Sequence, residues 1–472
     1  MSVSGSTKSP APQLGPLPGA RLALMLLLAI NLFNYIDRQV LSAALPEIEK
    51  QLPRPYSVAA KAVVGCSLVI IDPGRHNKTI LGSLTTMFII SYMLIAPLFG
   101  WLADRMSRWM LIGIGVILWS AASGASGLPG TLAEAPWNAT GLGLVMGPFG
   151  FLLLSRCFVG IGEAAYGPVA PTMISDLYPI KMRGYVLSWF YVAIPVGSAL
   201  GYIIGGQATQ HLGWPWSFYL VVPPGLLLGV LCFCMPEPPR GAADLGDKPV
   251  RRAGFKDYSI LLKTPSYVFD CLGMAAMTFA MGGIAHWMPY YVHTYRGAGE
   301  LGWVTTLFGI IVVVSGLAAT ILGGLTGDWL RGRFPGSYFL VSGAAMLCGF
   351  PAFLAVLYTP FPYAWGLIFV ACFCLFFNTG PSNTILANVT HPSLRAPAFA
   401  LNIFIIHILG DAVSPTVIGF IADYYQKDGL ADMNTGFLAV SFTILIGGIL
   451  WLIGSFFLER DTALAPHRLD QR

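Results

Sequence analysis

Long apolar runs separated by short polar connections make up most of this chain. Twelve of the runs reach about 20 residues, the length at which an α-helix crosses the hydrocarbon core of a bilayer. The pattern therefore predicts an all-α polytopic membrane protein with 12 transmembrane helices. The predicted spans are residues 21–46, 79–102, 109–128, 144–173, 184–210, 214–236, 266–292, 302–327, 337–358, 363–389, 396–422 and 434–458.

Composition supports the same fold class. Of the 472 residues, 55% are hydrophobic and 10% are charged, against about 25% charged in an average soluble domain. These proportions exclude a water-soluble fold. The net charge of +5 is small, and no basic tract is interleaved with aromatic residues. We therefore expect the lipid bilayer to surround the chain and no nucleic acid to bind it.

Catalytic and metal-binding patterns are missing from the sequence. The eight cysteines lie mostly inside apolar runs, where a thiol behaves as a small hydrophobic group. No cysteine pair has the spacing of metal ligands. No Ser/His/Asp array, HExxH motif or phosphate-binding glycine loop is present. We expect no enzymatic activity, no metal site and no cofactor.

The distribution of basic residues predicts the topology. With an even number of spans both chain ends lie on one side, and 18 of the 27 Lys and Arg residues then fall on that side. Basic residues concentrate on the cytoplasmic side of membrane proteins. The sequence therefore predicts an integral protein of the cell (inner or plasma) membrane with both termini in the cytoplasm. Residues 1–20 are rich in Pro, Ser and Gly without the features of a secretory signal, so we expect a disordered cytoplasmic tail.

An internal repeat predicts two six-helix bundles. Residues 237–265 carry mixed charges and separate six spans (residues 21–236) from six more (residues 266–458), with a cytoplasmic tail at 459–472. After the second span stands GWLADRMSR, and after the eighth stands GGLTGDWLRGR. Each motif places a carboxylate and basic residues at the same point of its half, as a duplication requires. Two loops on the other side, 47–78 and 129–143, are long, and we expect an interfacial helix near residues 58–71.

The first predicted span contains two charged residues, Asp37 and Arg38. A charge at this depth costs at least about 2.5 to 3.5 kcal/mol on insertion scales, so it needs a function or a partner. Neighbours on a helix point about 100° apart, so each residue needs partners on different helices. Asn31, Asn34, Tyr35 and Arg38 share one face, which predicts a polar stripe facing a cavity. The alternative is that the charged pair only pins helices together.

The fourth predicted span carries Arg156 and Glu163, two turns apart on one face. Gly160 and Gly162 leave room between them. Burial favours a proton on Glu163 and a nearby guanidinium opposes it, so Glu163 can alternate between a protonated and an arginine-paired state. An anionic substrate can replace the carboxylate at Arg156 or Arg38. The alternative is a static buried ion pair.

The eleventh and seventh predicted spans add residues from the second half. His407 and Asp411 lie four residues apart on one face, which predicts a hydrogen-bonded pair with either a transport or a structural role. The sequence GGIAHWMPYY predicts either a broken, gate-forming helix or aromatic anchors at the membrane interface. The candidates for lining the substrate cavity are therefore Asn31, Tyr35, Tyr166, Trp287, His407 and Asp411.

Charged residues at the cytoplasmic helix ends predict a conformational latch. Ion pairs between helix ends can form and break as two bundles rock. The alternative is that the basic residues only set the topology. The latch candidates are Asp104, Arg105, Arg108, Arg183, Asp328 and Arg331.

Several of these motifs resemble those of a known superfamily. GWLADRMSR, GGLTGDWLRGR and SRCFVGIGEA are similar to the loop and fourth-span motifs of major facilitators. Within that superfamily, NYIDRQVLSAALPEI and LRAPAFALNIFIIHILGDAVSP resemble the spinster transporters, over residues 30 to 455. The resemblance implies a two-bundle, alternating-access carrier for lysolipid- or sphingolipid-like amphiphiles. It also implies that protons are the coupling ion, through Asp37, Arg38, Arg156 and Glu163.

One other transporter class fits the same four residues. Carboxylate/proton symporters of the anion:cation symporter type, including sugar-acid carriers, look alike at the first-span and fourth-span charges. The HILGD segment of the eleventh span favours the spinster reading. We expect a small-molecule or lipid-like substrate as the partner and a monomer as the working unit.

Overall fold

The computed structural model describes residues 15–51, 77–131, 147–239, 258–391, 394–427 and 430–468. These residues form helices almost throughout, with one small antiparallel pair of strands, β1 (Gln426–Lys427) and β2 (Leu430–Ala431). The expected interfacial helix near residues 58–71, the first 14 residues and most of the expected linker lie outside the described residues.

The first half of the chain forms six spanning units. They are made by α1 (Ala20–Gln51), α3 (Asn77–Ala103), α4 (Arg108–Thr131), α6 (Pro148–Ala164) with α7 (Ala170–Leu177), α8 (Ile180–Leu212), and α9 (Trp214–Tyr219) with α10 (Val222–Phe233).

The second half repeats this plan. After the short α11 (Tyr258–Leu262) come α12 (Pro265–Tyr290), ending in the π-helical turn η4 (Tyr291–Tyr295), then α13 (Leu301–Arg331), α14 (Ser337–Tyr358), and α15 (Ala364–Phe377) with α16 (Thr379–Val389). The eleventh unit joins α17 (Arg395–Ile406), the π-helical turn η6 (His407–Asp411) and α18 (Ser414–Tyr424). The last helices are α19 (Met433–Gly454), α20 (Leu458–Leu464) and the short η7 (Ala465–His467).

All 12 predicted spans are confirmed as helices or pairs of consecutive helices. Eleven are long and apolar enough to cross a membrane as they stand. The fourth differs, because α6 ends at Ala164 and a turn separates it from α7. Pro168 and Pro171 follow closely, and a proline cannot supply the backbone N–H that would continue the helix. The region expected as a tail after residue 458 begins with α20, where Asp461 accepts a hydrogen bond from the Ser266 amide.

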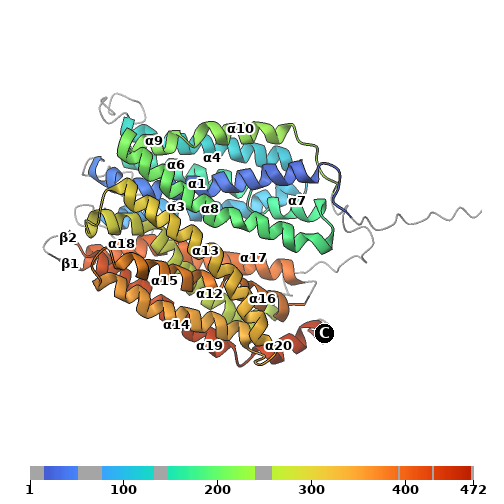
Figure 1. Cartoon of the computed structure of the whole chain (residues 1–472). Helices are drawn as coiled ribbons and strands as arrows, with labels where there is room; N and C mark the ends of the chain where they lie inside the picture. Colours follow the sequence, from blue (N-terminus) through green and yellow to red (C-terminus); the bar gives the residue numbers. More distant parts are fainter. Residues whose placement is uncertain are drawn as a thin grey trace, which may run out of the picture.

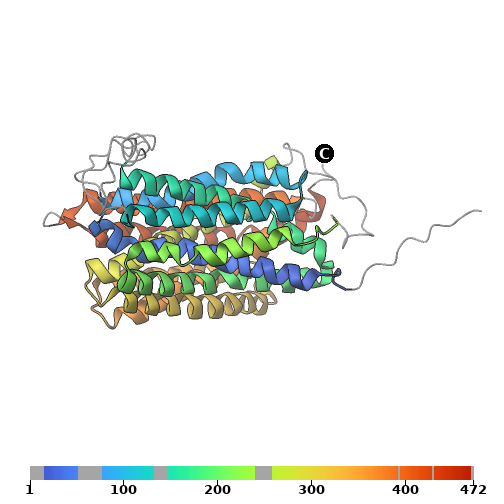
Figure 2. The same ribbon diagram turned by 90° about the horizontal axis from the view of Figure 1, so that it is seen from above.

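The helices lie nearly parallel and form an upper and a lower group in Figure 1; Figure 2 shows the same lengthwise packing from above. The start of α1 and the end of α20 lie toward the same end of the molecule, which we call the terminal side. We call the other end the opposite side. Most contacts between the two bundles are made by α1 with α12, α3 with α18, and α8 with α13, and α3 also contacts η6.

Contacts between the bundles are tight from mid-span to the opposite side. Gly82 of α3 lies against the backbone of Pro415, and Gly419 of α18 lies against the backbone of Lys78, so a Cβ at either glycine would collide. Hydrogen bonds cross the same region between Thr86 and Thr416 (2.7 Å), from the Tyr202 hydroxyl to the Ala285 carbonyl (2.8 Å), and from Gln210 Nε2 to Glu300 Oε2 (2.8 Å).

Burial along α3 changes at its midpoint. Leu81 and Leu84, in the half toward the opposite side, are buried, whereas Leu94 and Leu98 are 73% and 51% exposed. On α17 and η6, which approach the terminal side of the other bundle, Phe404 is likewise exposed. Apolar side chains in the terminal half of α3 are therefore exposed, whereas those in its other half are buried.

Candidate functional site

An ion pair inside the first bundle joins α1 to α6. Nε and Nη2 of Arg38 donate to Oε2 of Glu163 at 2.9 and 2.6 Å. Glu163 is 1% exposed and Arg38 is 22% exposed. The Arg38 guanidinium also lies over the rings of Tyr35, Phe88 and Tyr92, at 5.0, 5.2 and 5.9 Å from their centroids. One carboxylate oxygen and three aromatic faces therefore hold this charge.

The second charged pair lies beside the first and is looser. Nη1 of Arg156 is 3.9 Å from Oδ2 of Asp37, beyond hydrogen-bond distance, and both side chains are buried. The Ser123 hydroxyl of α4 donates to Oδ1 of Asp37. The Arg156 guanidinium also lies 5.3 Å from the centroid of Phe88. We call Asp37, Arg38, Arg156 and Glu163 the ion cluster.

The cluster agrees with the sequence in one respect and differs in another. Asp37 and Arg38 have separate partners, as their directions on α1 require. Both partners, however, lie on α6 at the seven-residue spacing of Arg156 and Glu163. Glu163 takes its hydrogen bonds from Arg38 of α1 and not from the guanidinium two turns away on its own helix.

Several polar atoms of the cluster have no hydrogen-bond partner among the described residues. They are Oδ2 of Asp37, Oε1 of Glu163, and Nε and Nη1 of Arg156. Most buried polar atoms in proteins have a partner, and an exception calls for an explanation. Two unpaired carboxylate oxygens can take a proton, and two unpaired guanidinium nitrogens can donate to an anion. The cluster therefore has the atoms needed to bind both.

Two cavity candidates of the first bundle lie in helix packing instead. Nδ2 of Asn31 donates to the Phe190 carbonyl of α8 at 2.8 Å. The Tyr166 hydroxyl donates to the Leu27 carbonyl at 2.7 Å. Both side chains are buried and their donors are used within the protein. Only the Tyr35 and Arg38 end of the predicted polar stripe keeps exposed surface.

The predicted pair on the eleventh span is confirmed. Nδ1 of His407 lies 2.8 Å from Oδ1 of Asp411, and each side chain keeps about a fifth of its surface exposed. Both residues lie in η6, where Gly410 has non-helical backbone angles (φ −106°, ψ −107°). The His407 ring meets the Tyr92 ring of α3 edge-on at 6.1 Å. Because Tyr92 also contacts Arg38, this pair from the second bundle faces the ion cluster.

The seventh span does not break at its two glycines, and Trp287 does not lie at the membrane surface. Helix α12 runs unbroken through Gly282 and Gly283, which serve close packing, since a Cβ on Gly282 would collide with Asp411. Trp287 is buried and its indole donates to the Pro415 carbonyl at 2.9 Å, so it neither lines the cavity nor anchors at the membrane surface. The irregular backbone of the second bundle lies at η4, which begins at Tyr291 of the same motif, and at η6.

His286, the histidine of GGIAHWMPYY, is not among the cavity residues that the sequence predicts. Its side chain is 2% exposed and its Nδ1 lies 2.8 Å from the Thr85 hydroxyl of α3. It is close enough to Arg156 for the two to interact electrostatically. An ionisable side chain within a membrane span is by itself a sign of function, and that sign could have found it.

A polar cluster at the opposite side, which the sequence did not single out, ties the bundles together. The Lys78 ammonium of α3 donates to Glu49 of α1 and to the Tyr290 hydroxyl of α12. That hydroxyl also donates to Oε2 of Glu49 at 2.7 Å. The Asp423 carboxylate of α18 accepts from the Thr79 amide and hydroxyl, both at 2.8 Å. We call Glu49, Lys78, Tyr290 and Asp423 the opposite-side cluster.

In this structure the latch candidates of the first bundle make their contacts within that bundle. Arg108 at the start of α4 donates to Asp176 of α7 at 2.5 Å and to Glu237 beyond α10 at 2.8 Å. Burial opposes the charged form of Glu237, but hydrogen bonds from Arg108, Ser107 and the Trp109 amide together hold the pKa of that carboxyl below its usual value. Arg105, in the turn after α3, donates to the Trp101 carbonyl of that helix.

The latch candidates of the second bundle also have local partners. The Tyr338 hydroxyl of α14 donates to Asp328 of α13 at 2.7 Å, and the Arg331 guanidinium lies 5.7 Å from the Tyr338 ring. Asp104 lies in the turn after α3, and Arg183 lies on α8. A charged contact between the bundles at these positions stays a prediction for another conformation.

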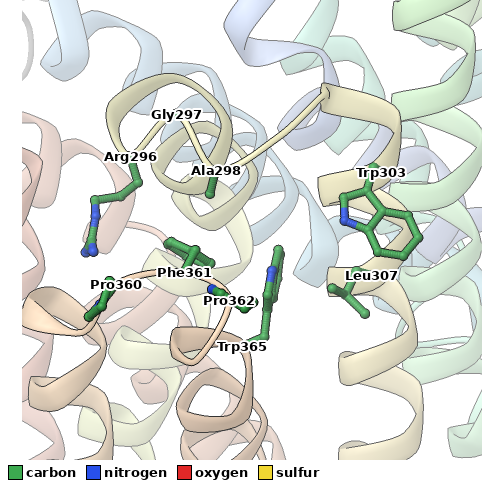
Figure 3. A pocket seen from close by; sticks show the side chains of 9 residues that line it. All are labelled: Arg296, Gly297, Ala298, Trp303, Leu307, Pro360, Phe361, Pro362 and Trp365. Carbon is green, nitrogen blue, oxygen red and sulfur yellow. The ribbon is translucent and has the colours of Figure 1, made fainter.

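A pocket on the opposite side offers no competing site. Its volume is about 630 Å³, and Arg296, Trp303, Phe361 and Trp365 are among the residues that line it (Figure 3). Nη1 and Nη2 of Arg296 donate to the Tyr291 hydroxyl and to backbone carbonyls of residues 356, 357 and 359. These donors are occupied by the protein, unlike those of Arg156.

Comparison with known proteins agrees with this architecture. The family model described as Major Facilitator Superfamily matches residues 27–415. Two solved structures share the fold. A bacterial homologue of the human lysosomal transporter spinster, in an inward-facing and unoccupied conformation, aligns with a TM-score of 0.70 and 21% identity over 96% of this chain and 98% of its own. A D-xylose-proton symporter aligns with a TM-score of 0.68 and 19% identity over 93% and 96%.

Sequence relatives are closer. Protein spinster homolog 3 of Danio rerio is 32% identical over 469 residues, which cover 94% of this chain and 86% of the relative. The sphingosine-1-phosphate transporter SPNS2 of Mus musculus is 31% identical over 470 residues, covering 93% and 78%. The chain therefore belongs to the Major Facilitator Superfamily and, within it, to the spinster family of membrane transporters.

Proposed function

We propose that this protein is a proton-coupled secondary transporter that moves an amphiphile with an anionic headgroup, such as a lysolipid or a sphingolipid phosphate, by alternating access. The observation that supports this most is the ion cluster, where unpaired carboxylate oxygens and unpaired guanidinium nitrogens lie together in the membrane-spanning part of the protein. Ionisable groups at this depth are costly and usually mark a substrate or proton pathway.

The contacts between the bundles support alternating access. At the opposite side Lys78, Glu49 and Tyr290 tie the bundles together. The hydrogen bonds described above between the two bundles lie from mid-span to the opposite side. With the terminal side in the cytoplasm, as the basic residues predict, this arrangement corresponds to a carrier open inward. Rocking the bundles would break the opposite-side cluster and close the terminal side.

The ion cluster supports coupling of this motion to protons. A proton on Glu163 would remove the charge that Arg38 is paired with and release the guanidinium. Nε and Nη1 of Arg156 have no partner among the described residues, so they can donate to an anionic headgroup. Proton and substrate then compete for, or share, the same arginines, which biases the equilibrium between the two bundle arrangements. No cofactor is needed for this cycle.

The amphiphilic nature of the substrate has separate support. The rings of Tyr35, Phe88 and Tyr92 lie against the Arg38 guanidinium, so apolar surface adjoins the charges of the ion cluster. A lipid chain can lie along such a surface while its headgroup reaches Arg156. The mouse relative is named a sphingosine-1-phosphate transporter. We extend that substrate class to this chain and propose that the monomer in the cell membrane is the working unit.

The alternative is a sugar-acid or other carboxylate symporter. The charges on α1 and α6 serve that function equally well, and a D-xylose-proton symporter shares the fold. A sugar acid, however, needs many hydroxyl partners. The rings of Tyr35, Phe88 and Tyr92 surround Arg38 instead.

Reconstituted vesicles with an imposed pH gradient test the proposal. We expect the wild-type protein to accumulate or expel sphingosine-1-phosphate in response to the gradient and to ignore glucuronate. Arg156→Ala should abolish the response, whereas His293→Gln, at a half-buried site in η4 far from the cluster, should not. Gradient-driven transport of glucuronate without the phosphorylated lipid would establish the alternative, and transport of neither would refute the proposal.

A further inference from the structure

His286 is a buried polar side chain of the second bundle with one ring nitrogen unused. Its Nε2 has no hydrogen-bond partner among the described residues. The side chain is nine-tenths or more buried. His286 lies on α12, the helix that contacts α1 across the interface between the two bundles.

The other ring nitrogen is fixed from the first bundle. Nδ1 of His286 lies 2.8 Å from the Thr85 hydroxyl of α3. A neutral imidazole carries its proton on one nitrogen only. When the Thr85 hydroxyl donates to Nδ1, Nε2 carries the hydrogen and becomes a donor. The contact to Thr85 thereby orients the ring and leaves the N–H at Nε2 free to donate.

Arg156 presents unused donors to the same region. Thr85 contacts His286, and Phe88, one turn further along α3, lies under the Arg156 guanidinium. One helical turn separates these two points on α3. Nε and Nη1 of Arg156 have no hydrogen-bond partner among the described residues. The two bundles thus direct unpaired donors toward one region beside α3.

We propose that His286 is a substrate ligand of the second bundle, whose Nε2–H donates to the same phosphate headgroup that Arg156 holds from the first bundle. This inference rests on the proposed transport of an anionic amphiphile. A phosphate accepts hydrogen bonds of about 2.8 Å on several oxygens, so one group can join donors that lie a helical turn apart. A carboxylate offers fewer oxygens for such a bridge.

A phosphate headgroup bound by both His286 and Arg156 also links substrate binding to the motion of the two bundles. Arg156 moves with α6 and His286 moves with α12, and the two helices belong to different bundles. A ligand that contacts both has a different affinity for each bundle arrangement, which is the requirement for driving a conformational change. His286 therefore contributes specificity for the phosphate and coupling to the motion.

Binding of two matched lipids to the purified full-length protein tests the inference. The probes are sphingosine-1-phosphate and sphingosine, which differ only in the phosphate, and the measured quantity is the ratio of their dissociation constants. His286→Gln keeps an N–H near the position of Nε2, whereas His286→Asn keeps a polar group near Nδ1. His293→Gln is the matched control, because His293 lies in η4 with its Nδ1 against the Gly299 carbonyl.

We expect His286→Asn and His286→Leu to weaken sphingosine-1-phosphate binding about tenfold to a hundredfold, the effect of losing a hydrogen bond to a charged group, with sphingosine binding unchanged. His286→Gln should retain most of the phosphate preference. If Asn retains it and Gln does not, the role of His286 is toward Thr85 and the inference is wrong. Should the Leu variant not fold, the Gln and Asn pair decides.

The controls separate this inference from the proposed function. If Arg156→Ala loses the phosphate preference while every His286 variant keeps it, only the role of His286 is refuted. If the wild-type protein binds both lipids equally or binds neither, the proposed anionic headgroup is wrong, and the bridge is wrong with it.

Discussion

Replacing Glu163 by glutamine isolates the charge of the central ion pair. The substitution keeps the side-chain length and one carbonyl oxygen, and it removes the negative charge and the titratable proton. Arg38, which donates at 2.9 and 2.6 Å to one oxygen of Glu163, loses its ionic partner. We expect the variant to fold, to be less stable, and to transport without dependence on pH.

The size of the stability change follows from the geometry. Removing one partner of a buried ion pair costs about 3 to 5 kcal/mol, because a charge is left unpaired. Arg38 is 22% exposed and lies over three aromatic rings, each of which contributes about 0.5 to 1 kcal/mol to holding a cation. These features soften the loss, so we expect a decrease of about 2 to 3 kcal/mol in the free energy of unfolding.

A double-mutant cycle measures the pair itself. Arg38→Met should destabilise the protein by leaving Glu163 without its donor, and the double variant should be more stable than the sum of the two single losses predicts. We expect a coupling of at least about 1.5 kcal/mol, typical of hydrogen bonds to charged groups. Thermal unfolding in detergent gives the stabilities, and uptake into vesicles at pH 5 to 8 gives the pH profile.

Two results would refute this reasoning. Additive effects of Arg38→Met and Glu163→Gln on stability would mean that the 2.6 Å contact contributes nothing specific. A Glu163→Gln variant with the pH profile of the wild type would mean that the titrating group lies elsewhere, because glutamine cannot carry the proton. Glu459→Gln, at an exposed position in α20, serves as the control for loss of one negative charge.

Three further predictions concern the two ends of the molecule. Lys78→Met removes the cation that joins Glu49 to the second bundle; cysteine accessibility on the opposite side should rise because this closed end is weakened. Arg108→Ala removes the guanidinium that pairs with Asp176 and Glu237 and should lower the unfolding temperature without changing substrate affinity, as a ligand-binding assay would show. Burial opposes the charge of Asp432, but hydrogen bonds from Tyr295, Thr435 and the Asn434 and Thr435 amides outweigh it and hold its pKa below the usual 3.8. Its stabilising effect at the start of α19 is therefore present above about pH 4 and lost as the pH falls through the lowered pKa. Asp432→Ala should remove that pH dependence and, because it removes the N-cap, cost about 0.5 to 2 kcal/mol at neutral pH.

The sequence predicts the helices well because lipid imposes a simple rule. Every span must satisfy its own backbone, so a run of about 20 apolar residues becomes a helix whatever its neighbours are. The fourth predicted span is the exception to this rule. The fourth run of apolar residues continues past Ala164, but α6 ends there because Pro168 lacks the N–H that would bond the Ala164 carbonyl. Hydrophobicity indicates that a segment is in the membrane, and backbone chemistry decides where its helix ends.

The sequence predicts which charged residues belong to the site better than it predicts which of them form ion pairs with each other. The cost of burying a charge identifies Asp37, Arg38, Arg156 and Glu163 from the sequence. Which arginine pairs with Glu163 depends on how α1 is rotated against α6, which spacing along one helix does not contain. For the same reason Trp287, an aromatic residue near a helix end, is buried against the Pro415 backbone.

Residues that act between the two bundles are the least predictable from the sequence. Lys78 falls at the edge of a long loop in the sequence, yet its charge reaches Glu49 and Tyr290. His286 is a single polar residue in an apolar run, and its significance comes from Thr85 and Arg156 on other helices. Such residues are defined by contacts between elements far apart in the chain, and they become visible only when the two bundles are placed together.

Proton movement accompanying substrate movement tests the central claim most directly. Wild-type protein in vesicles containing a pH-sensitive dye should show a proton flux when sphingosine-1-phosphate is added without any imposed gradient, in a fixed ratio to the lipid transported. Glu163→Gln should carry the lipid with no proton flux. Transport of the lipid by the wild-type protein with no change in internal pH would contradict the coupling that we assign to the ion cluster.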